Sequence, residues 1–277
     1  GEPGAEIIYP DPGFPIYESM INYTGAKAVP FNLLEKKDFS INPDKVLSLI
    51  NEKTRLLILN NPHNPTGGFT EKTIMDKLAK GLAKFSHVAI LTDEVYSRLI
   101  FDKKEIPTLL NYPNLYDRLI VLDGWSKTYA MTGWRLGWGV WPKSLIEHVF
   151  KFCVNNHSCV NTAAQYGAIT ALDGPEDHLN DMMKEFTIRR KLIVDGLRSL
   201  KGVECSLPGG SFFIFPNVKG TGMSGEEFTD KCLQEAGVVM IPGTAFGKFA
   251  TDHVRFNFAT SRENITEAIA KIDKMLQ

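Results

Sequence analysis

Short apolar runs alternate with amphipathic stretches through the first half of the chain. Three runs rich in aliphatic residues, Arg55–Leu59, Val88–Leu91 and Leu119–Leu122, are typical of buried strands. Between such runs, Pro43–Ile50 and Thr70–Phe85 have helical periodicity, with Asn42 and Thr70 as predicted N-caps. Strands that are apolar throughout, separated by helices, predict an α/β fold. We expect a mostly parallel sheet with helices on both faces.

The pattern changes after Trp141 and Pro142. Helices are predicted at Ser144–Cys153 and Thr162–Leu172, followed by a long amphipathic helix over Glu176–Leu200. The rest mixes short strands with helices, which favours a smaller α+β domain. We therefore predict a large domain over residues 1–172 and a small C-terminal domain over residues 173–277. The remaining predicted elements are strands near Val203–Ser206, Ser211–Phe215, Val238–Ile241 and Val254–Phe258 and helices at Ser224–Ala236 and Arg262–Leu276.

Composition narrows the class of protein. The 277 residues carry 31 basic and 32 acidic side chains, well mixed, with a net charge of −1, so neither a nucleic-acid partner nor a membrane surface is expected. No apolar run approaches the ~20 residues that span a bilayer. The four scattered cysteines indicate free thiols in a reducing compartment, and we predict a cytoplasmic protein. The six histidines have no metal-ligand spacing, so no metal is predicted.

Polar clusters follow the predicted strands. They occupy residues 10–15, 60–67, 92–96 and 123–135, and ligands of parallel sheets bind at the carboxyl ends of strands. In the last cluster Lys127 lies among Trp125, Tyr129, Met131 and Trp134. Loss of solvation favours the neutral amine that attacks carbonyl groups. A Ser-Lys dipeptide taken alone is more often a solvated loop.

Five motifs occur together in this order: Asn64-Pro-Thr-Gly67, Asp93-x-x-Tyr96, Ser126-Lys127, Gly133-Trp-Arg135 and Arg255-Phe-Asn-Phe258. Together they resemble fold-type I aminotransferases of class I/II, near the aspartate aminotransferases. The resemblance extends from Tyr9 to Leu276. It implies the aspartate aminotransferase fold and the cofactor pyridoxal 5′-phosphate (PLP).

The resemblance also implies roles in catalysis. Lys127 would hold the cofactor aldehyde and move a proton at the substrate. Asp93 would lie against the pyridine nitrogen and raise its pKa. Tyr96 and Asn64 would contact the 3′-oxygen of the cofactor, Asn64 would also contact the substrate, and the Asn64–Pro65 bond is expected to be cis.

Binding roles follow from the same resemblance. Ser126 and Arg135 would hold the phosphate, and Phe14 would stack on the pyridine ring. Arg255 would bind the substrate α-carboxylate through its planar guanidinium, with Phe212 lining the substrate pocket. Many relatives carry a serine at the position of Gly124, so one phosphate contact is expected to be missing.

Each of these residues also has a simpler reading. Asp93 fits a helix cap, Asn64 a turn before proline, Phe14 core packing and Arg255 an exposed strand edge. The stretch Asn155–Ser158 fits either a substrate-pocket lining or a helix N-terminus. The motifs do not indicate which side chain the substrate carries.

The function predicted first is transfer of an amino group between an α-amino acid and a 2-oxo acid, in two stages, by a homodimer. A PLP-dependent β-lyase and the PLP-sensing effector domain of a transcription regulator are alternatives on the same fold. The family's N-terminal portion has no counterpart in this sequence. That portion supplies a Gly-rich helix start at the phosphate, a tyrosine donated across the dimer and part of the small domain, so we expect the activity of the 277-residue chain to be impaired.

Overall fold

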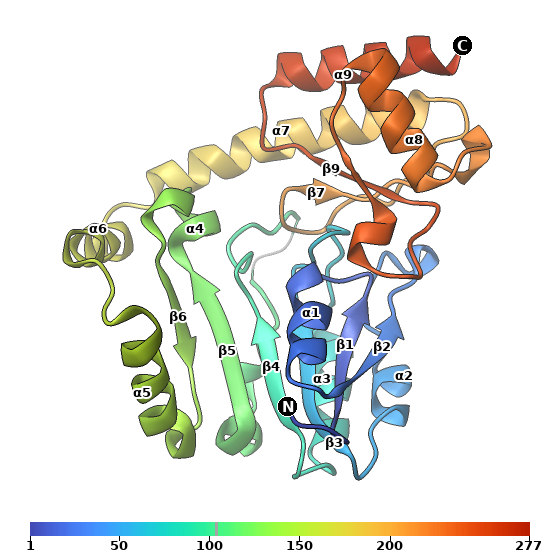
Figure 1. Cartoon of the computed structure of the whole chain (residues 1–277). Helices are drawn as coiled ribbons and strands as arrows, with labels where there is room; N and C mark the ends of the chain where they lie inside the picture. The colour runs from blue at the N-terminus through green and yellow to red at the C-terminus, as the bar shows by residue number, and fades with distance from the viewer. Residues whose placement is uncertain (103–104) are drawn as a thin grey trace.

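The computed structural model describes residues 1–102 and 105–277, and a six-stranded sheet forms its centre (Figure 1). The strand order is β2-β1-β3-β4-β5-β6. The first five strands are parallel, and β6 is antiparallel to β5. The strands are β1 (Glu6–Asp11), β2 (Lys27–Asn32), β3 (Thr54–Asn60), β4 (Ala89–Asp93), β5 (Leu119–Gly124) and β6 (Gly137–Val140).

Both faces of this sheet are covered. Ile7 of β1 packs with α1 (Pro15–Tyr23), whereas the next residue, Ile8, packs in the cluster that includes α2 (Pro43–Ser48) and α3 (Lys72–Leu82). Successive strand residues point to opposite faces, so a strand covered on both sides must be apolar throughout. The α/β class expected from the apolar runs is confirmed.

A second set of elements lies beyond the carboxyl ends of the parallel strands (Figure 1). It is a small antiparallel sheet in the order β7-β9-β8, packed with the long helix α7 and with α8 and α9. Phe228, Val254 and Ile272 lie in its core. The elements after β5 are α4 (Trp125–Thr128), α5 (Ile146–His157), α6 (Thr162–Asp173), α7 (Asp177–Ser199), β7 (Phe213–Ile214), α8 (Gly225–Lys231), a π-helical turn (Cys232–Ala236), β8 (Ile241–Pro242), β9 (Val254–Asn257) and α9 (Arg262–Leu276).

Two local predictions are wrong. Helix α3 begins at Lys72 with Glu71 at its N-cap, because the Thr70 hydroxyl instead accepts the Ile41 amide at 3.2 Å. Val203–Ser206 forms no strand; it contributes a single bridge, from Glu204 to Asn217. Both predictions rested on local pattern, whereas the conformation of each segment depends on contacts with residues outside it.

Strand β6 begins two residues after Arg135, because Arg135 has a left-handed backbone with φ 56°. In the described part of the chain, no helix combines the length and apolarity needed to cross a bilayer.

Candidate active site

The predicted site residues gather where the parallel strands end. β1, β3, β4 and β5 finish at Asp11, Asn60, Asp93 and Gly124, on the side that faces the small sheet (Figure 1). There a cavity of about 500 Å³ lies between the strand ends and β9. Its lining includes eight of the nine predicted site residues: Phe14, Asn64, Asp93, Tyr96, Ser126, Lys127, Arg135 and Arg255.

Lys127 reaches this cavity from α4, the single helical turn that follows β5. Its side chain is half-buried, and Nζ lies 5.7 Å from the centre of the Phe212 ring. Burial lowers the Lys127 pKa, the cations of Arg135 and Arg255 lower it further, and Asp93 opposes them. These surroundings favour the neutral, nucleophilic amine.

Asp93 is held from two directions. The Tyr17 hydroxyl donates to its Oδ2 at 2.6 Å, and the Val95 amide donates to its Oδ1 at 3.2 Å. Burial raises the Asp93 pKa, and both hydrogen bonds and Lys127 oppose that rise. A cation placed against this carboxylate would oppose the rise in its pKa, so the site suits a protonated ring nitrogen.

Tyr17 was missed in the sequence. The available signal was its position one helical turn after Phe14, and the two ring centres lie 5.7 Å apart. The bond from Tyr17 to Asp93 spans 76 residues, so only the folded chain reveals it.

Asn60 was also missed, and it organises the Asn64 loop. Its Nδ2 donates to the Asp93 carbonyl at 2.9 Å, and its Oδ1 accepts the Asn64 amide at 2.9 Å. The Asn64–Pro65 bond is cis, as expected. Gly67 closes the loop with φ 72°, and a Cβ there would lie 2.5 Å from the Phe213 carbonyl oxygen, so a larger residue does not fit.

Arg255 projects from β9 between two aromatic rings. Its guanidinium carbon lies 4.4 Å from the centre of Phe213 and 4.6 Å from that of Phe246. Nη1 donates to Asn64 Oδ1 at 3.0 Å. Burial lowers the Arg255 pKa and Tyr96 opposes this, but an arginine stays charged, so the site holds a partly buried, planar cation.

Phe212 and Phe213 lie at different places around the cavity. Phe213 lines the cavity, while Phe212 approaches Lys127 from beside it. Both rings lie edge-on to Tyr96, with centres 5.6 and 5.9 Å away. The sequence prediction selected Phe212 for the pocket and overlooked Phe213, although the two adjacent phenylalanines looked alike in the sequence.

Ser126 and Arg135 bring a hydroxyl and a guanidinium to the cavity beside Lys127. The left-handed backbone of Arg135 turns the chain before β6, and Nη1 donates to the Thr132 carbonyl at 3.0 Å. Gly124 cannot supply a hydroxyl, and a Cβ there would lie 2.9 Å from the Leu136 carbonyl oxygen.

This set of donors matches the chemistry of PLP. The cavity offers an amine for the aldehyde, a carboxylate for the ring nitrogen, cations and a hydroxyl for a phosphate, and aromatic walls. Around it, the described residues contain no cluster of three or more His, Cys, Asp or Glu side chains that could hold a metal ion.

Comparison with known proteins agrees with this geometry. Residues 1–272 match the family model for aminotransferase class I and II. The chain is 38% identical to the aspartate aminotransferase of Pyrococcus horikoshii, with all of this chain and 70% of that protein aligned. It is 34% identical to aromatic-amino-acid aminotransferase 2 of Thermococcus litoralis, with 98% of this chain and 70% of that protein aligned. The crystal structure of the aspartate aminotransferase from Rhizobium meliloti superimposes with a TM-score of 0.95 at 30% identity, covering 100% of this chain and 71% of that one.

The fold and its site define a PLP-dependent transferase of the aspartate aminotransferase type. Within that type, the chain belongs to the class I and II aminotransferases, which use PLP to transfer amino groups between amino acids and 2-oxo acids. Of the three functions left open by the motifs, the relatives support the aminotransferase.

Proposed function

We propose that the cavity between the strand ends and β9 holds PLP and that Lys127 carries it. The observation that supports this most directly is that Lys127 and Asp93 line one cavity. In this assignment Ser126 and Arg135 bind the phosphate, and Phe14 packs against the ring. Asn64 and Tyr96 face the ring's 3′-oxygen. PLP supplies the electron sink that stabilises negative charge at the substrate Cα.

The chain's own residues supply the proton transfers and the orientation. The lowered pKa of Lys127 lets its neutral amine take a proton from the substrate Cα and return it at C4′ of the cofactor. Asp93 keeps the pyridine nitrogen protonated, because an anion beside a base raises the pKa of that base. Tyr17 and Val95 fix the direction of the Asp93 carboxylate.

Arg255 would bind the α-carboxylate, the group that an amino acid and a 2-oxo acid share. The rings of Phe213 and Phe246 hold the guanidinium, and Asn64 occupies one of its donors. A planar guanidinium can meet a carboxylate through two parallel hydrogen bonds. Asn64 would therefore touch both the cofactor and the substrate end of the site, while Phe212 restricts the space beside Lys127.

Attachment of PLP at Lys127 is tested by borohydride reduction of the PLP-loaded protein, followed by peptide mass mapping. The pyridoxyl group should appear on Lys127. The control is Lys143→Ala, which changes an exposed lysine outside the cavity and should leave the labelled peptide unchanged. Label on a different lysine would refute the assignment.

We further propose a two-domain homodimer in the cytoplasm. The large domain, residues 1–172, would carry Lys127 and Asp93, and the small domain, residues 173–277, would carry Arg255. The site would then lie between domains, which is where cofactor sites are common. The four free cysteines support a reducing compartment, and fractionation of cells that express the native gene would test the location.

A further inference from the structure

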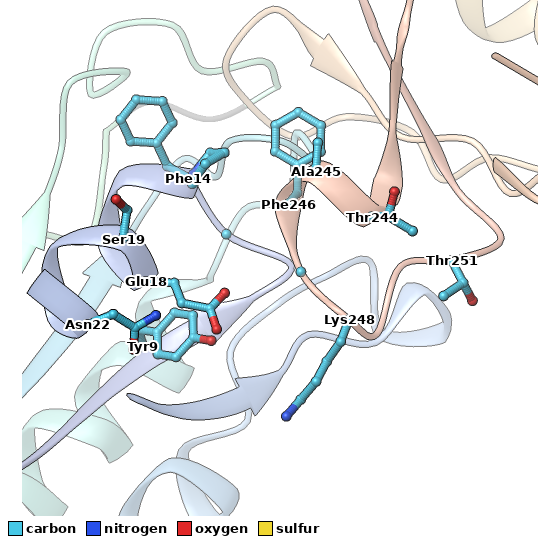
Figure 2. Close-up of a pocket in the computed structure, with 13 residues that line it drawn as sticks. Tyr9, Phe14, Glu18, Ser19, Asn22, Thr244, Ala245, Phe246, Lys248 and Thr251 are labelled. Atoms are coloured by element: carbon cyan, nitrogen blue, oxygen red, sulfur yellow. The ribbon is translucent and has the colours of Figure 1, made fainter. Parts of the chain in front are cut away.

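The end of β1 is joined to a turn of the small sheet more than 230 residues later. Asp11, the last residue of β1, is 1% exposed, and its carboxylate accepts the Lys248 amide at 3.2 Å and the Phe249 amide at 3.3 Å. Beside it the Gly13 amide donates to the Phe246 carbonyl at 2.7 Å. Figure 2 shows this turn passing close to the chain that leads into α1.

The turn is shaped around the carboxylate. Gly247 has φ 144°, and a Cβ at this position would lie 2.0 Å from Asp11 Oδ1. Burial raises the Asp11 pKa, Glu18 raises it further, and the two amides with the Lys248 ammonium lower it. Burying a carboxylate costs free energy unless it is hydrogen-bonded. In the folded chain the hydrogen bonds from the Lys248 and Phe249 amides to Asp11 are therefore strongly favoured.

Phe246 links the contacts of Asp11 to Arg255, the residue proposed to bind the substrate carboxylate and called the substrate clamp below. Its carbonyl is held by Gly13, and its ring lies against the Arg255 guanidinium with 4.6 Å between ring centre and Cζ. The ring is 5% exposed and also packs edge-on against Phe215. A shift of the turn would therefore move one of the two rings between which Arg255 lies.

We propose that Asp11 is a positioning residue: by holding the amides of Lys248 and Phe249, it sets the place of Phe246 and, through it, the direction of the Arg255 guanidinium. This rests on the proposed function, in which Arg255 binds the substrate carboxylate. Asp11 contacts neither cofactor nor substrate in this assignment. Asp11 would act through the alignment of Arg255 with the substrate carboxylate. Small misalignments of binding groups lower catalytic efficiency strongly.

Asp11→Ala and Asp11→Asn in the PLP-saturated enzyme test this. We expect KM for the amino acid and for the 2-oxo acid to rise together, by about tenfold in Asp11→Ala and less in Asp11→Asn, which retains one acceptor oxygen. We expect kcat and the absorbance of bound PLP to change little. Lys248→Ala is the matched control, because it removes the side chain and keeps the amide that Asp11 binds; its KM should equal that of the native chain.

Hydrogen exchange of the peptide over residues 243–251 gives a readout independent of turnover. Exchange should accelerate in both Asp11 variants and stay unchanged in Lys248→Ala. If Asp11→Ala does not fold, Asp11→Asn, of nearly equal volume, carries the test. A lower melting temperature with unchanged KM would show a purely structural role and overturn the proposal.

Arg255→Lys, measured in parallel, separates the proposed role of Arg255 from the proposed role of Asp11. It keeps the charge and loses the planar fork, so KM for both substrates should rise if Arg255 is the clamp. Unchanged KM in Arg255→Lys would refute the proposed role of Arg255. Raised KM in Arg255→Lys but not in the Asp11 variants would refute the role of Asp11 alone.

Discussion

At the scale of single residues, the site brings opposite charges into one partly buried cavity. Lys127, Arg135 and Arg255 share it with Asp93, and each lies within the electrostatic influence of at least one other. The three cations outnumber the two carboxylates that line the cavity, Asp93 and Asp123, so the neutral form of the lysine is favoured and anionic groups are attracted. The same arrangement that activates the amine therefore also suits a phosphate and a carboxylate.

Asp93→Asn tests the charge at this scale. The amide keeps the shape but removes the anion, so the ring nitrogen would lose its proton and kcat should fall by about 100-fold or more, with PLP still bound. Steady-state rates together with PLP absorbance measure the two effects. Tyr17→Phe deletes only the hydroxyl that donates to Asp93. Its kcat should fall by about tenfold, since one hydrogen bond to a charged group is lost. A near-normal rate in Asp93→Asn would place the ring nitrogen elsewhere.

At the scale of elements, the loop between β3 and α3 contains no regular structure but is buried and hydrogen-bonded. His63 Nδ1 lies 2.8 Å from Thr66 Oγ1, and the Asn61 side chain bonds both backbone groups of Thr70. These four residues are buried. The loop that carries Asn64 is therefore held by buried side-chain hydrogen bonds together with backbone bonds such as Gly67 N to the His63 carbonyl.

His63 makes the stability of this loop depend on pH. Burial lowers its pKa to about 3 in the folded chain, against about 6.5 in an unfolded one. As pH falls through 6.5, His63 binds a proton in the unfolded chain but not in the folded chain. The contribution of His63 to stability should therefore fall by up to about 1.4 kcal/mol per pH unit between pH 6.5 and pH 3, and it should not vary with pH above 6.5.

Urea unfolding at pH 7, 6 and 5 measures this dependence. His63→Gln should be less stable at pH 7, because the bond to Thr66 is disturbed, and should lose less stability between pH 7 and 5 than the native chain. His178→Gln, at an exposed histidine, should keep the native dependence on pH. Identical slopes in the native chain and His63→Gln would contradict the burial argument.

At the scale of the whole molecule, α5 and α6 lie at one side of the sheet (Figure 1). Several large apolar side chains of this region are exposed to solvent. Phe150 and Phe152 are each 68% exposed, and Tyr166 is 70% exposed. Ile146, Val154, Val160, Ile169 and Leu172 are also exposed there. Exposed apolar side chains gathered on one surface are typical of interaction sites, and we propose that this surface forms the two-fold contact of the proposed homodimer.

Sedimentation velocity tests this assignment. The native chain should sediment as a dimer at micromolar concentration, and the double variant Phe150→Asp, Phe152→Asp should shift to monomer, because buried unpaired charge opposes association. Val239→Asp, at a 79% exposed valine outside α5 and α6, should remain dimeric. A monomeric native chain that still transaminates would contradict a shared site.

The elements that the sequence predicted best are those whose pattern is local. The apolar strands and helices α2 and α3 appear within a few residues of their expected bounds, because burial on both sheet faces demands continuous apolar strands. The short strands of the small sheet were harder: β7 and β8 have two residues each, too few for any periodicity to show. Motifs selected Lys127, Asp93 and Arg255 as candidates because each residue type is tied to a chemical task, and all three line one cavity.

The sequence by itself thus determined the fold class, the family and the residue types of the site, since hydrophobic period and motif spacing are carried by neighbours in the chain. Tertiary structure alone decided which groups orient those residues. Tyr17 meets Asp93, Asn60 meets Asp93, and Asp11 meets the turn after Phe246, through hydrogen bonds that no local pattern encodes. Such pairs form only after strands distant in sequence have been placed side by side, because a hydrogen bond depends on position and direction within a fraction of an ångström.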